Sequence, residues 1–401
     1  MTPAPSVLIV GASAAGLSVA ENLRRGGFAG RLTMIGEEHH LPYDRPPLSK
    51  EVLSGLWPDS KTQLRDRSTL SQLDIDLRLG TGAERVDSAA RIVTDADGTQ
   101  IAYDDLVIAT GVRPRPLAGT EGLQGVHVLR TLDDAQRLRS ALDGRPRLVI
   151  VGAGFLGAEV ASVARTAGAD VTLVSDIESP LSDVLGTELG GLLLRAHTDH
   201  GVRLKTGVKV AAVTHHDNRV AGVELADGST LPADAVLVAI GSIPNTEWLA
   251  GSGIPIGDGV ICDEFCRAQP GVWAAGDVAS WHHVELDERL RLEHRTNAAD
   301  QGIAVARNIL AADSPTPFTP VPYIWSDQYD LKLQIYGQTR GADAFTVVDG
   351  DLADRKFVAV YGKAGHVRGA VGAGMIRPLR AARALVAARA PWSTIEQGAS
   401  V

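Results

Sequence analysis

The sequence is poor in cysteine and in aromatic residues, and it lacks any long apolar run. Only two cysteines occur in 401 residues, which excludes a scaffold held by several disulfides and suits a reducing compartment. No stretch has the unbroken apolar length that a membrane span requires. Lysine and arginine number 39 against 48 acidic residues, a net charge of −9, so nonspecific binding to nucleic acid or to an anionic membrane is not expected. These absences predict a cytoplasmic globular protein.

Glycine, by contrast, is abundant, with 43 residues, while aromatic residues make up only 4% of the chain. A chain of this length exceeds one ordinary domain, so two or three domains are expected. The hydrophobic share of 44% and the charged share of 22% are those of a globular protein. Such a composition is typical of α/β folds that bind nucleotides.

One supersecondary unit occurs twice in the chain. Each copy runs from a short apolar strand through a glycine turn into a helix, and then into a second strand that ends near an acidic residue. The segments are residues 7–10, 11–16, 17–25 and 31–37 in the first copy and 148–151, 152–157, 158–167 and 170–176 in the second. Two copies of this pattern predict two Rossmann-like dinucleotide sites.

The glycines of each turn have separate tasks. The first allows the tight turn, the second lets the backbone approach a pyrophosphate, and the third lets the helix pack closely on the strand. The pyrophosphate then lies at the helix N-terminus, which favours anions. Ser13 replaces the middle glycine in the first copy. The expected contacts are Gly11, Ser13, Ala14, Ala15 and Gly16 in one site and Gly152, Gly154, Phe155, Leu156 and Gly157 in the other.

An acidic residue about 20 positions after each turn is expected to bind ribose hydroxyls. Glu37 has that position in the first copy and Asp176 in the second. No cation follows Asp176, because the sequence continues to Glu178, so the second site should prefer NADH to NADPH. Either Ser175 or Asp176 occupies the ribose position.

Three further apolar strands are expected to close on a glycine near a helix start, over residues 105–111, 235–241 and 271–277. A glycine there lets the backbone cross close to a cofactor. The candidate cofactor contacts at these strand ends are Thr110, Gly111, Gly241, Gly276 and Asp277. Asp277 has an alternative role as a helix N-cap.

Four longer motifs carry a resemblance to a known family. They are Tyr43-Asp44-Arg45-Pro46-Pro47-Leu48-Ser49-Lys50, Leu129-Arg130-Thr131, Arg291-Leu292-Glu293-His294 with Asn297-Ala298, and Trp325-Ser326-Asp327-Gln328-Tyr329. Together with the two glycine turns they resemble the FAD-containing, NADH-dependent ferredoxin reductases that serve bacterial oxygenases, over nearly the whole chain. One departure is Thr296, near which many relatives carry an aromatic or apolar residue.

The resemblance implies an α/β fold with two Rossmann-like dinucleotide-binding domains, one for FAD and one for NADH, and an α+β C-terminal domain. The FAD domain would comprise residues 1–113 and 241–312, the NADH domain 114–240 and the C-terminal domain 318–401. A proline-rich stretch at 312–320 independently marks the last boundary.

The resemblance also implies roles for residues outside the glycine turns. Lys50 would lie against the flavin ring, with Glu159 as its partner, and Trp325 near the flavin edge that faces a docked protein. Glu159 would lie on the first helical turn, where the helix dipole favours a carboxylate in any case, and Trp325 has an alternative role in the core. The other implied FAD contacts are Arg45, Ala83, Arg130, Glu293 and Arg295.

Two kinds of site are not expected. Residues 36–60 contain no cysteine, whereas disulfide reductases, NADH oxidases and peroxidases of this fold need a redox cysteine there. The Cys262/Cys266 pair is therefore interpreted as incidental. The histidine pairs at 39–40, 215–216 and 282–283 are adjacent in sequence, so their side chains diverge and no metal site is expected.

The implied activity is electron transfer from NADH through FAD to a two-iron ferredoxin that feeds a haem monooxygenase or a Rieske dioxygenase. Two alternatives are reduction of a small quinone or radical acceptor and a binding role like that of apoptosis-inducing factor. A monomer or weak dimer is expected. A local basic patch for the ferredoxin is expected from Arg65, Arg67, Arg377 and Arg380, which are otherwise solvated surface residues.

Overall fold

The computed structural model describes residues 4–311 and 313–398 and divides into two compact units. The first unit comprises the chain up to Asp44 together with Ser60–Arg113 and Ile243–Pro320. The second comprises Arg45–Asp59, Pro114–Ser242 and the chain from Val321 onward. The domain boundaries expected above stay a prediction, and those at residues 1, 312 and 401 lie outside the described residues.

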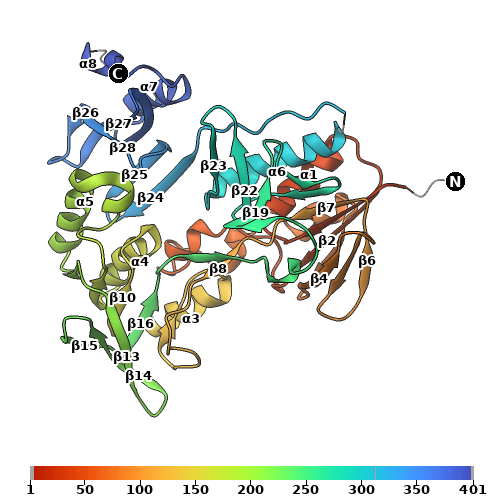
Figure 1. Ribbon diagram of the computed structural model, residues 1–401. Helices are drawn as coiled ribbons and strands as arrows, with labels where there is room; N and C mark the ends of the chain where they lie inside the picture. The colour runs from red at the N-terminus through yellow and green to blue at the C-terminus, as the bar shows by residue number, and fades with distance from the viewer. Residues whose placement is uncertain (1–3, 312, 399–401) are drawn as a thin grey trace. The chain divides into compact units, whose positions relative to one another are not determined.

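The first unit is built on a six-stranded sheet in the order β20-β21-β7-β1-β2-β3. Figure 1 labels β7 and β2 of this sheet. Every neighbouring pair is parallel except β20–β21, which is antiparallel. The strands are β1 (Ser6–Val10), β2 (Arg31–Gly36), β3 (Asp76–Leu79), β7 (Asp105–Ile108), β20 (Arg267–Gln269) and β21 (Val272–Ala274). All five residues of β1 are buried, as a parallel strand covered on both faces requires.

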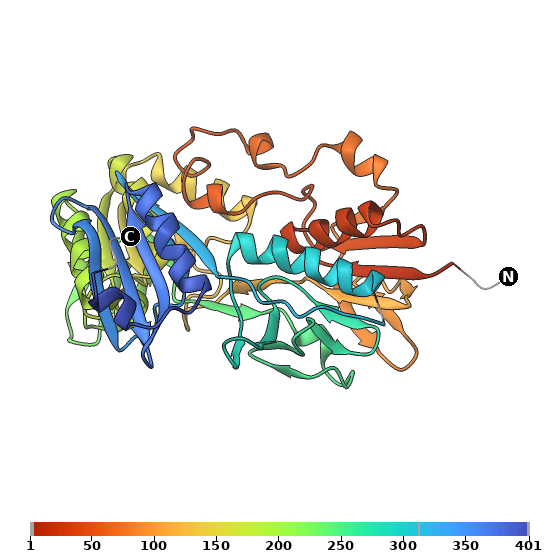
Figure 2. The ribbon, with the colours of Figure 1, turned by 90° about the horizontal axis from the view of Figure 1, so that it is seen from above.

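Two helices lie side by side on this sheet, α1 (Ala14–Arg25) and α6 (Arg295–Leu310) (Figure 2). The Ser18 hydroxyl donates to the Ala299 carbonyl at 2.7 Å, and a Cβ added to Gly26 would meet Leu310. The first of these contacts joins the early parts of the two helices and the second joins their late parts. The helices α1 and α6 are therefore parallel and begin at the same end of the sheet.

Smaller elements complete the first unit. A three-stranded sheet contains β4 (Ala83–Asp87), β5 (Ile92–Asp95) and β6 (Gln100–Ala102), and a four-stranded sheet contains β18 (Ile256–Gly257), β19 (Gly259–Cys262), β22 (Ala279–His283) and β23 (Glu288–Leu290). The short helices are α2 (Arg67–Gln72) and η3 (Glu247–Leu249). Three elements span the points where the chain passes from one unit to the other: η2 (Asp59–Thr62), β8 (Val112–Pro114) and β17 (Ser242–Pro244).

The second unit repeats the parallel architecture in a five-stranded sheet of order β12-β11-β10-β16-β9. The strands are β9 (Val126–His127), β10 (Arg147–Val151), β11 (Asp170–Val174), β12 (Arg203–Lys205) and β16 (Ala235–Val238). The helices are η1 (Pro46–Ser49), α3 (Leu132–Leu142), α4 (Phe155–Thr166) and α5 (Ser182–Asp199), and an antiparallel meander contains β13 (Val210–His216), β14 (Arg219–Leu225) and β15 (Thr230–Pro232).

Helix α3 begins at a capping box that explains one of the sequence motifs. The Thr131 hydroxyl accepts from the Asp134 N–H at 3.1 Å, and the Asp134 carboxylate accepts from the Thr131 N–H at 2.9 Å and the Arg130 N–H at 3.0 Å. Reciprocal capping of this kind satisfies N–H groups that a helix start leaves without partners.

The C-terminal part of the second unit is an antiparallel sheet of order β24-β25-β28-β27-β26. The strands are β24 (Tyr323–Gln328), β25 (Leu331–Gly337), β26 (Ala344–Asp351), β27 (Lys356–Lys363) and β28 (His366–Ala373), followed by α7 (Ile376–Ala387) and α8 (Ser393–Glu396). Residues of β27 alternate between two cores: Phe357 and Tyr361 pack with leucines of α5, whereas Val358 and Val360 pack with Leu379 of α7. This period of two is that of a strand buried on both faces.

The architecture confirms the predicted α/β class with two Rossmann-like units and an α+β C-terminal part. Along the chain, strands rather than helices follow three of the predicted glycines: β8 follows Gly111, β17 follows Gly241 and β22 follows Gly276. Asp277 therefore does not cap a helix.

Candidate functional site

The first glycine turn, in the first unit, has no room for a side chain at Gly11 or Gly16. A Cβ added to Gly11, whose φ is +120°, would lie 2.1 Å from the Ala109 carbonyl oxygen, and one added to Gly16 would lie 2.0 Å from the Gly11 carbonyl oxygen. The turn is thus pressed against the end of β7, directly before Thr110 and Gly111. This is the close approach of strand, turn and helix that the sequence pattern predicts.

The start of α1 carries no competing anion. Ser13 is the N-cap, its side chain makes no capping hydrogen bond, and no acidic residue lies in the first turn. Ala14 and Ala15 follow as the first helical residues. Helix N–H groups that no capping side chain or nearby acid engages form an anion site, because the helix dipole adds a partial positive charge.

Gly276 lies at the start of α1 in space, although not along the chain, and Asp277 follows it. A Cβ on Gly276 would lie 3.0 Å from the Ala15 Cβ. The Gly276 N–H donates to Gln301 of α6 at 2.8 Å, so the loop is tied to both helices. Asp277 is half-buried in the turn before β22.

The start of α6 adds a residue that the sequence analysis did not select. His294 is its N-cap and makes no capping hydrogen bond. Burial lowers the pKa of His294 to about 4, and its Nδ1 is buried without a hydrogen-bond partner. A buried polar atom without a partner costs free energy, so this end of the sheet fits a polar ligand. Membership in the Arg291–His294 motif was the available signal.

Among the other predicted residues of this unit, Glu37 and Ala83 lie in one region, whereas Arg295 and Glu293 are each paired with another side chain. Glu37 is exposed at the end of β2, and a Cβ on Gly82 would lie 3.7 Å from its Cβ, which brings Ala83, the next residue, into the same region. Arg295 forms an ion pair with Asp44. Glu293 accepts from Arg291 at 2.7 Å, so that carboxylate is already engaged by the protein.

The second glycine turn, in the second unit, repeats the geometry of the first. A Cβ on Gly152, with φ +110°, would lie 2.2 Å from the Ala239 carbonyl oxygen, and one on Gly157 would lie 2.0 Å from the Gly152 carbonyl oxygen. Gly154 is the N-cap of α4, is exposed, and has nothing within 4 Å of the added Cβ. Phe155 and Leu156 are half-buried beside it. Gly241 has a φ of +101° and lies between the neighbouring β16 and β17.

Of the two candidates for the ribose position after β11, Ser175 and Asp176, only one faces solvent. Ser175 is buried and its hydroxyl accepts from the Ile177 N–H at 3.4 Å, whereas Asp176 is exposed. Lys205 of β12 pairs with Val174, the residue before Ser175. This pairing joins residues about thirty positions apart along the chain, so the local sequence does not show it.

Lys50 and Glu159 meet in the second unit. The Lys50 Nζ lies 2.6 Å from Glu159 Oε2, with side-chain exposures of 12% and 7%. The Ser49 hydroxyl donates to the same oxygen at 2.6 Å, and the Ser326 hydroxyl donates to Oε1 at 2.9 Å. Glu159 is the fifth residue of α4, and no acidic residue lies in the first turn. Its expected place on the first turn was therefore wrong, and side-chain donors, rather than the helix dipole, satisfy it.

Arg45 and Trp325 flank this cluster along the chain. Arg45 donates to the Arg130 carbonyl at 2.9 Å, directly before the α3 capping box. Trp325 is half-buried on β24, and its ring lies 5.9 Å from that of Tyr323.

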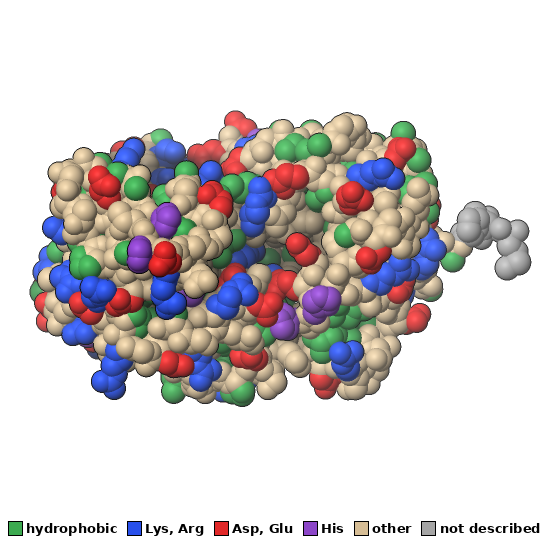
Figure 3. Space-filling model, turned by 90° about the horizontal axis from the view of Figure 1, so that it is seen from below, with side chains coloured by type: hydrophobic (Ala, Val, Ile, Leu, Met, Phe, Trp, Pro, Cys, Tyr) green, Lys and Arg blue, Asp and Glu red, His purple; other side chains and the backbone are tan. Residues whose placement is uncertain are grey.

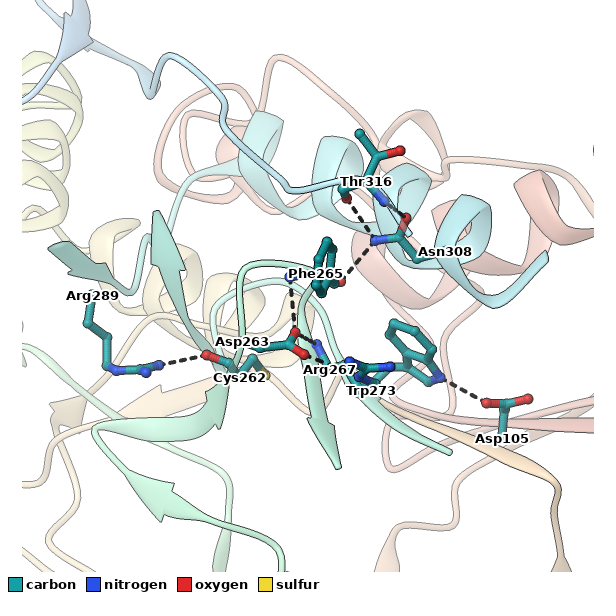
Figure 4. A network of polar contacts seen from close by, with 9 residues as sticks. All are labelled: Asp105, Cys262, Asp263, Phe265, Arg267, Trp273, Arg289, Asn308 and Thr316. Carbon is teal, nitrogen blue, oxygen red and sulfur yellow. Dashed lines mark hydrogen bonds and ion pairs between the residues drawn. The ribbon is translucent and has the colours of Figure 1, made fainter. Parts of the chain in front are cut away.

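Both cysteines are buried in the first unit, and Cys262 belongs to a network of polar contacts there (Figure 4). Arg289 donates to the Cys262 carbonyl at 2.9 Å, and Asp263 accepts from the N–H groups of Phe265 and Arg267 at 3.0 and 2.9 Å. Burial raises the pKa of both thiols, that of Cys266 to about 12. Thiols that stay protonated are poor nucleophiles, so this pair is structural.

Within residues 4–311 and 313–398, no group of three or more His, Cys, Asp or Glu side chains is placed to bind a metal. Every helix there is too short or too polar to cross a bilayer.

The arginines expected at a docking surface occupy both units. Arg65 pairs with Glu21 at 2.5 Å and Arg67 is exposed, both in the first unit. Arg377 and Arg380 are exposed on α7 of the second unit. On the face that Figure 3 presents, basic and acidic side chains are interspersed.

Comparison with known families gives two matches. The pyridine nucleotide-disulphide oxidoreductase family matches residues 5–302, and the reductase C-terminal family matches residues 323–396. Together they account for most of the chain.

Similar proteins include rhodocoxin reductase of Rhodococcus erythropolis, which is 39% identical over 85% of this chain and 80% of its own length. The ferredoxin–NAD(+) reductase component of the p-cumate 2,3-dioxygenase system of Pseudomonas putida is also 39% identical, over 86% of this chain and 84% of its own length.

Two crystal structures share the whole fold. The putidaredoxin reductase in a covalent complex with putidaredoxin has a TM-score of 0.92 at 31% identity and covers 97% of this chain and 94% of its own. A ferredoxin reductase from Rhodopseudomonas palustris has a TM-score of 0.88 at 37% identity, covering 92% and 91%. These matches confirm the resemblance found in the motifs. The chain therefore belongs to the pyridine nucleotide-disulphide oxidoreductase family and, within it, to the ferredoxin reductases, whose cofactors are FAD and NAD(H).

Proposed function

We propose that this reductase carries electrons from NADH through FAD to a two-iron ferredoxin that serves an oxygenase. The observation that carries the proposal is the pair of glycine turns with matching close approaches, each at the start of a helix without an acidic first turn. When bound, FAD would supply the chemistry of accepting a hydride from NADH and passing the two electrons on one at a time. The protein positions the two cofactors and tunes the charge around them, so no acid–base residue is required.

FAD is assigned to the first turn. Gly11, Ser13 and the α1 N-terminus would hold the pyrophosphate, and Glu37 the adenosine ribose, with Ala83 near the adenine. His294 and Asp277 lie at the same end of the sheet, where the unpartnered His294 Nδ1 supports a polar ligand. Further contacts are assigned by family resemblance to Arg45, Thr110, Gly111, Arg130, Gly276, Glu293 and Arg295.

NADH is assigned to the second turn. The open Gly154 lets the pyrophosphate approach the backbone, and Phe155, Leu156, Gly157 and Gly241 line the same strand ends. Asp176, which is exposed whereas Ser175 is buried, is the side chain assigned to the ribose hydroxyls. Its carboxylate would repel the additional phosphate of NADPH.

Lys50 is assigned to the flavin ring, with Glu159 as the group that holds it and Trp325 at the edge facing the ferredoxin. A cation beside the flavin would stabilise the negative charge that reduction adds. The buried ion pair supports this assignment, because removing a lysine and a carboxylate from water costs free energy, which packing alone would not require.

The partner and setting complete the proposal. Relatives are named as reductases of dioxygenase systems and, in one crystal structure, are joined to a putidaredoxin, which supports a ferredoxin partner here. We further propose a FAD domain of residues 1–113 and 241–312, an NADH domain of 114–240, a C-terminal domain of 318–401, a monomer or weak dimer, and a cytoplasmic location.

The experiment is NADH-dependent reduction of cytochrome c, with and without added two-iron ferredoxins. Stimulation of at least tenfold by one ferredoxin supports the proposal. Full activity with a quinone and none with any ferredoxin of a broad panel would instead support the small-acceptor alternative. The purified protein should contain about one FAD per chain by absorbance.

A further inference from the structure

The ion pair of Lys50 and Glu159 is the end of a longer buried network in the second unit. The Gln328 Nε2 donates to the Ser326 hydroxyl at 3.2 Å, and Gln328 Oε1 lies 3.1 Å from His197 Nε2. His197 Nδ1 lies 3.1 Å from the Tyr329 hydroxyl. Ser326, Gln328 and His197 have 0% exposure. Glu159 of α4, His197 of α5 and two residues of β24 are thereby joined.

The direction of every hydrogen bond in this network follows from chemistry. Because Glu159 can only accept when ionised, the Ser326 hydroxyl donates to it and must accept from Gln328. The Gln328 amide nitrogen therefore faces Ser326, and its oxygen accepts from the His197 Nε2–H. Burial lowers the pKa of His197 to about 4, so the ring is neutral near pH 7 and its Nδ1 accepts from Tyr329. All donors thus point one way, toward Glu159.

At the end of the network away from Glu159, Tyr329 is also held by contacts with its neighbours. The Tyr329 N–H donates to the Ser162 hydroxyl of α4 at 2.7 Å, three residues after Glu159. The Tyr329 ring stacks on His200 at 3.7 Å between centroids, and burial raises the pKa of its hydroxyl. Tyr329 therefore stays a donor.

We propose that Ser326, Gln328 and His197 are positioning residues for Lys50: their one-way donor chain holds the Glu159 carboxylate in the place where it binds the lysine ammonium. The proposal rests on the proposed function only in placing Lys50 beside the flavin. Hydrogen bonds in such a chain polarise one another, and each buried donor left without its acceptor is costly, so the network favours one orientation of Glu159. Losing a link frees the carboxylate to turn and releases Lys50.

Two variants break the chain in different ways. Ser326→Ala removes the donor to Glu159 Oε1. Gln328→Glu keeps the shape and the acceptor for His197 but removes the donor to Ser326, whose hydroxyl is then drawn away from Glu159. Gln338→Glu is the matched control, because Gln338 accepts from Arg368 at 2.6 Å and a carboxylate keeps that bond. Lys50→Met sets the largest effect expected.

The first readout is the reactivity of Lys50 in the FAD-bound protein, measured by mass spectrometry after limited acetylation, with exposed Lys356 as the internal standard. Ser326→Ala and Gln328→Glu should each raise the Lys50 rate about tenfold, and Gln338→Glu should leave it unchanged. Thermal melting shows whether each variant is folded, and Ser326→Ala carries the test if Gln328→Glu, which buries a new charge, does not fold.

The second readout is the midpoint potential of the flavin. Lys50→Met and both chain-breaking variants should lower it by a tenfold change in the equilibrium, which is about 30 mV for a two-electron couple. The proposal is overturned if both chain-breaking variants keep the wild-type acetylation rate and the wild-type potential while Lys50→Met shifts the potential. That outcome leaves the proposed function intact. An unshifted potential in Lys50→Met contradicts the flavin placement of Lys50 instead, and the acetylation rates then decide on the network alone.

Discussion

The buried histidine of this network makes stability depend on pH in a direction that can be worked out. The pKa of His197 falls from its ordinary 6.5 to about 4, because burial disfavours the charged ring and His200 adds a smaller repulsion. Between these values the unfolded chain binds the proton and the folded chain does not, so folding stability falls as the pH falls from about 7 to 4. The full difference is about 3 kcal/mol, of which about 2 kcal/mol is lost by pH 5.

Replacing the histidine removes this dependence. His197→Phe should be less stable than wild type at pH 7.5, because Gln328 and Tyr329 lose a buried partner, but its stability should change about 2 kcal/mol less between pH 7.5 and 5.0. Urea unfolding of the FAD-free protein at the two pH values measures this, with exposed His366→Phe as the control. His294, whose pKa is also lowered to about 4, contributes equally in both proteins and cancels. An equal pH dependence in His197→Phe and wild type would refute the reasoning.

Three further predictions address the proposed function. Gly16→Ala should abolish FAD binding, measured by absorbance, because its Cβ would lie 2.0 Å from the Gly11 carbonyl oxygen, whereas Gly144→Ala has nothing within 4 Å and should bind normally. Asp176→Ala should lower the ratio of kcat/KM for NADH to that for NADPH about tenfold. An unchanged ratio would show that the Asp176 carboxylate does not bind the ribose. Arg377→Glu with Arg380→Glu should raise the KM for ferredoxin and spare that for NADH, an effect weakened by salt because exposed charges are screened over about 10 Å at 0.1 M.

The parts of the fold that the sequence predicted are those that local backbone geometry dictates. Gly11 and Gly152 need positive φ, and Gly16 and Gly157 need the space of a missing Cβ, each within one strand–turn–helix unit. Such requirements leave a pattern of glycines at fixed spacing, which is why both units could be recognised from one sequence.

Position in space, unlike position along the chain, could not be predicted. The alternative role of Asp277 as a helix N-cap fails because a strand, β22, follows it. Lys205 is paired with Val174 of β11 only through the sheet. Contacts of this kind have no signature at short sequence separation.

Strand β24 shows how a polar network can still leave a trace in the sequence. Its residues alternate, so Ser326 and Gln328 share one face while Trp325 and Asp327 share the other. Polar residues are normally exposed and tryptophan buried, yet here Ser326 and Gln328 are fully buried, whereas Trp325 and Asp327 are only half-buried.

Burying two polar side chains on the inner face of a strand costs free energy unless each finds a partner. The partners come from α4 and α5, at Glu159 and His197, and both lie more than a hundred residues before the strand. The inverted pattern of the Trp325–Tyr329 motif therefore indicates that a buried polar network exists, whereas its members and the direction of its hydrogen bonds follow only from the folded chain. A strand whose small polar residues alternate with an aromatic residue is, on this argument, better interpreted with the polar face inward whenever a buried charge elsewhere in the chain requires donors.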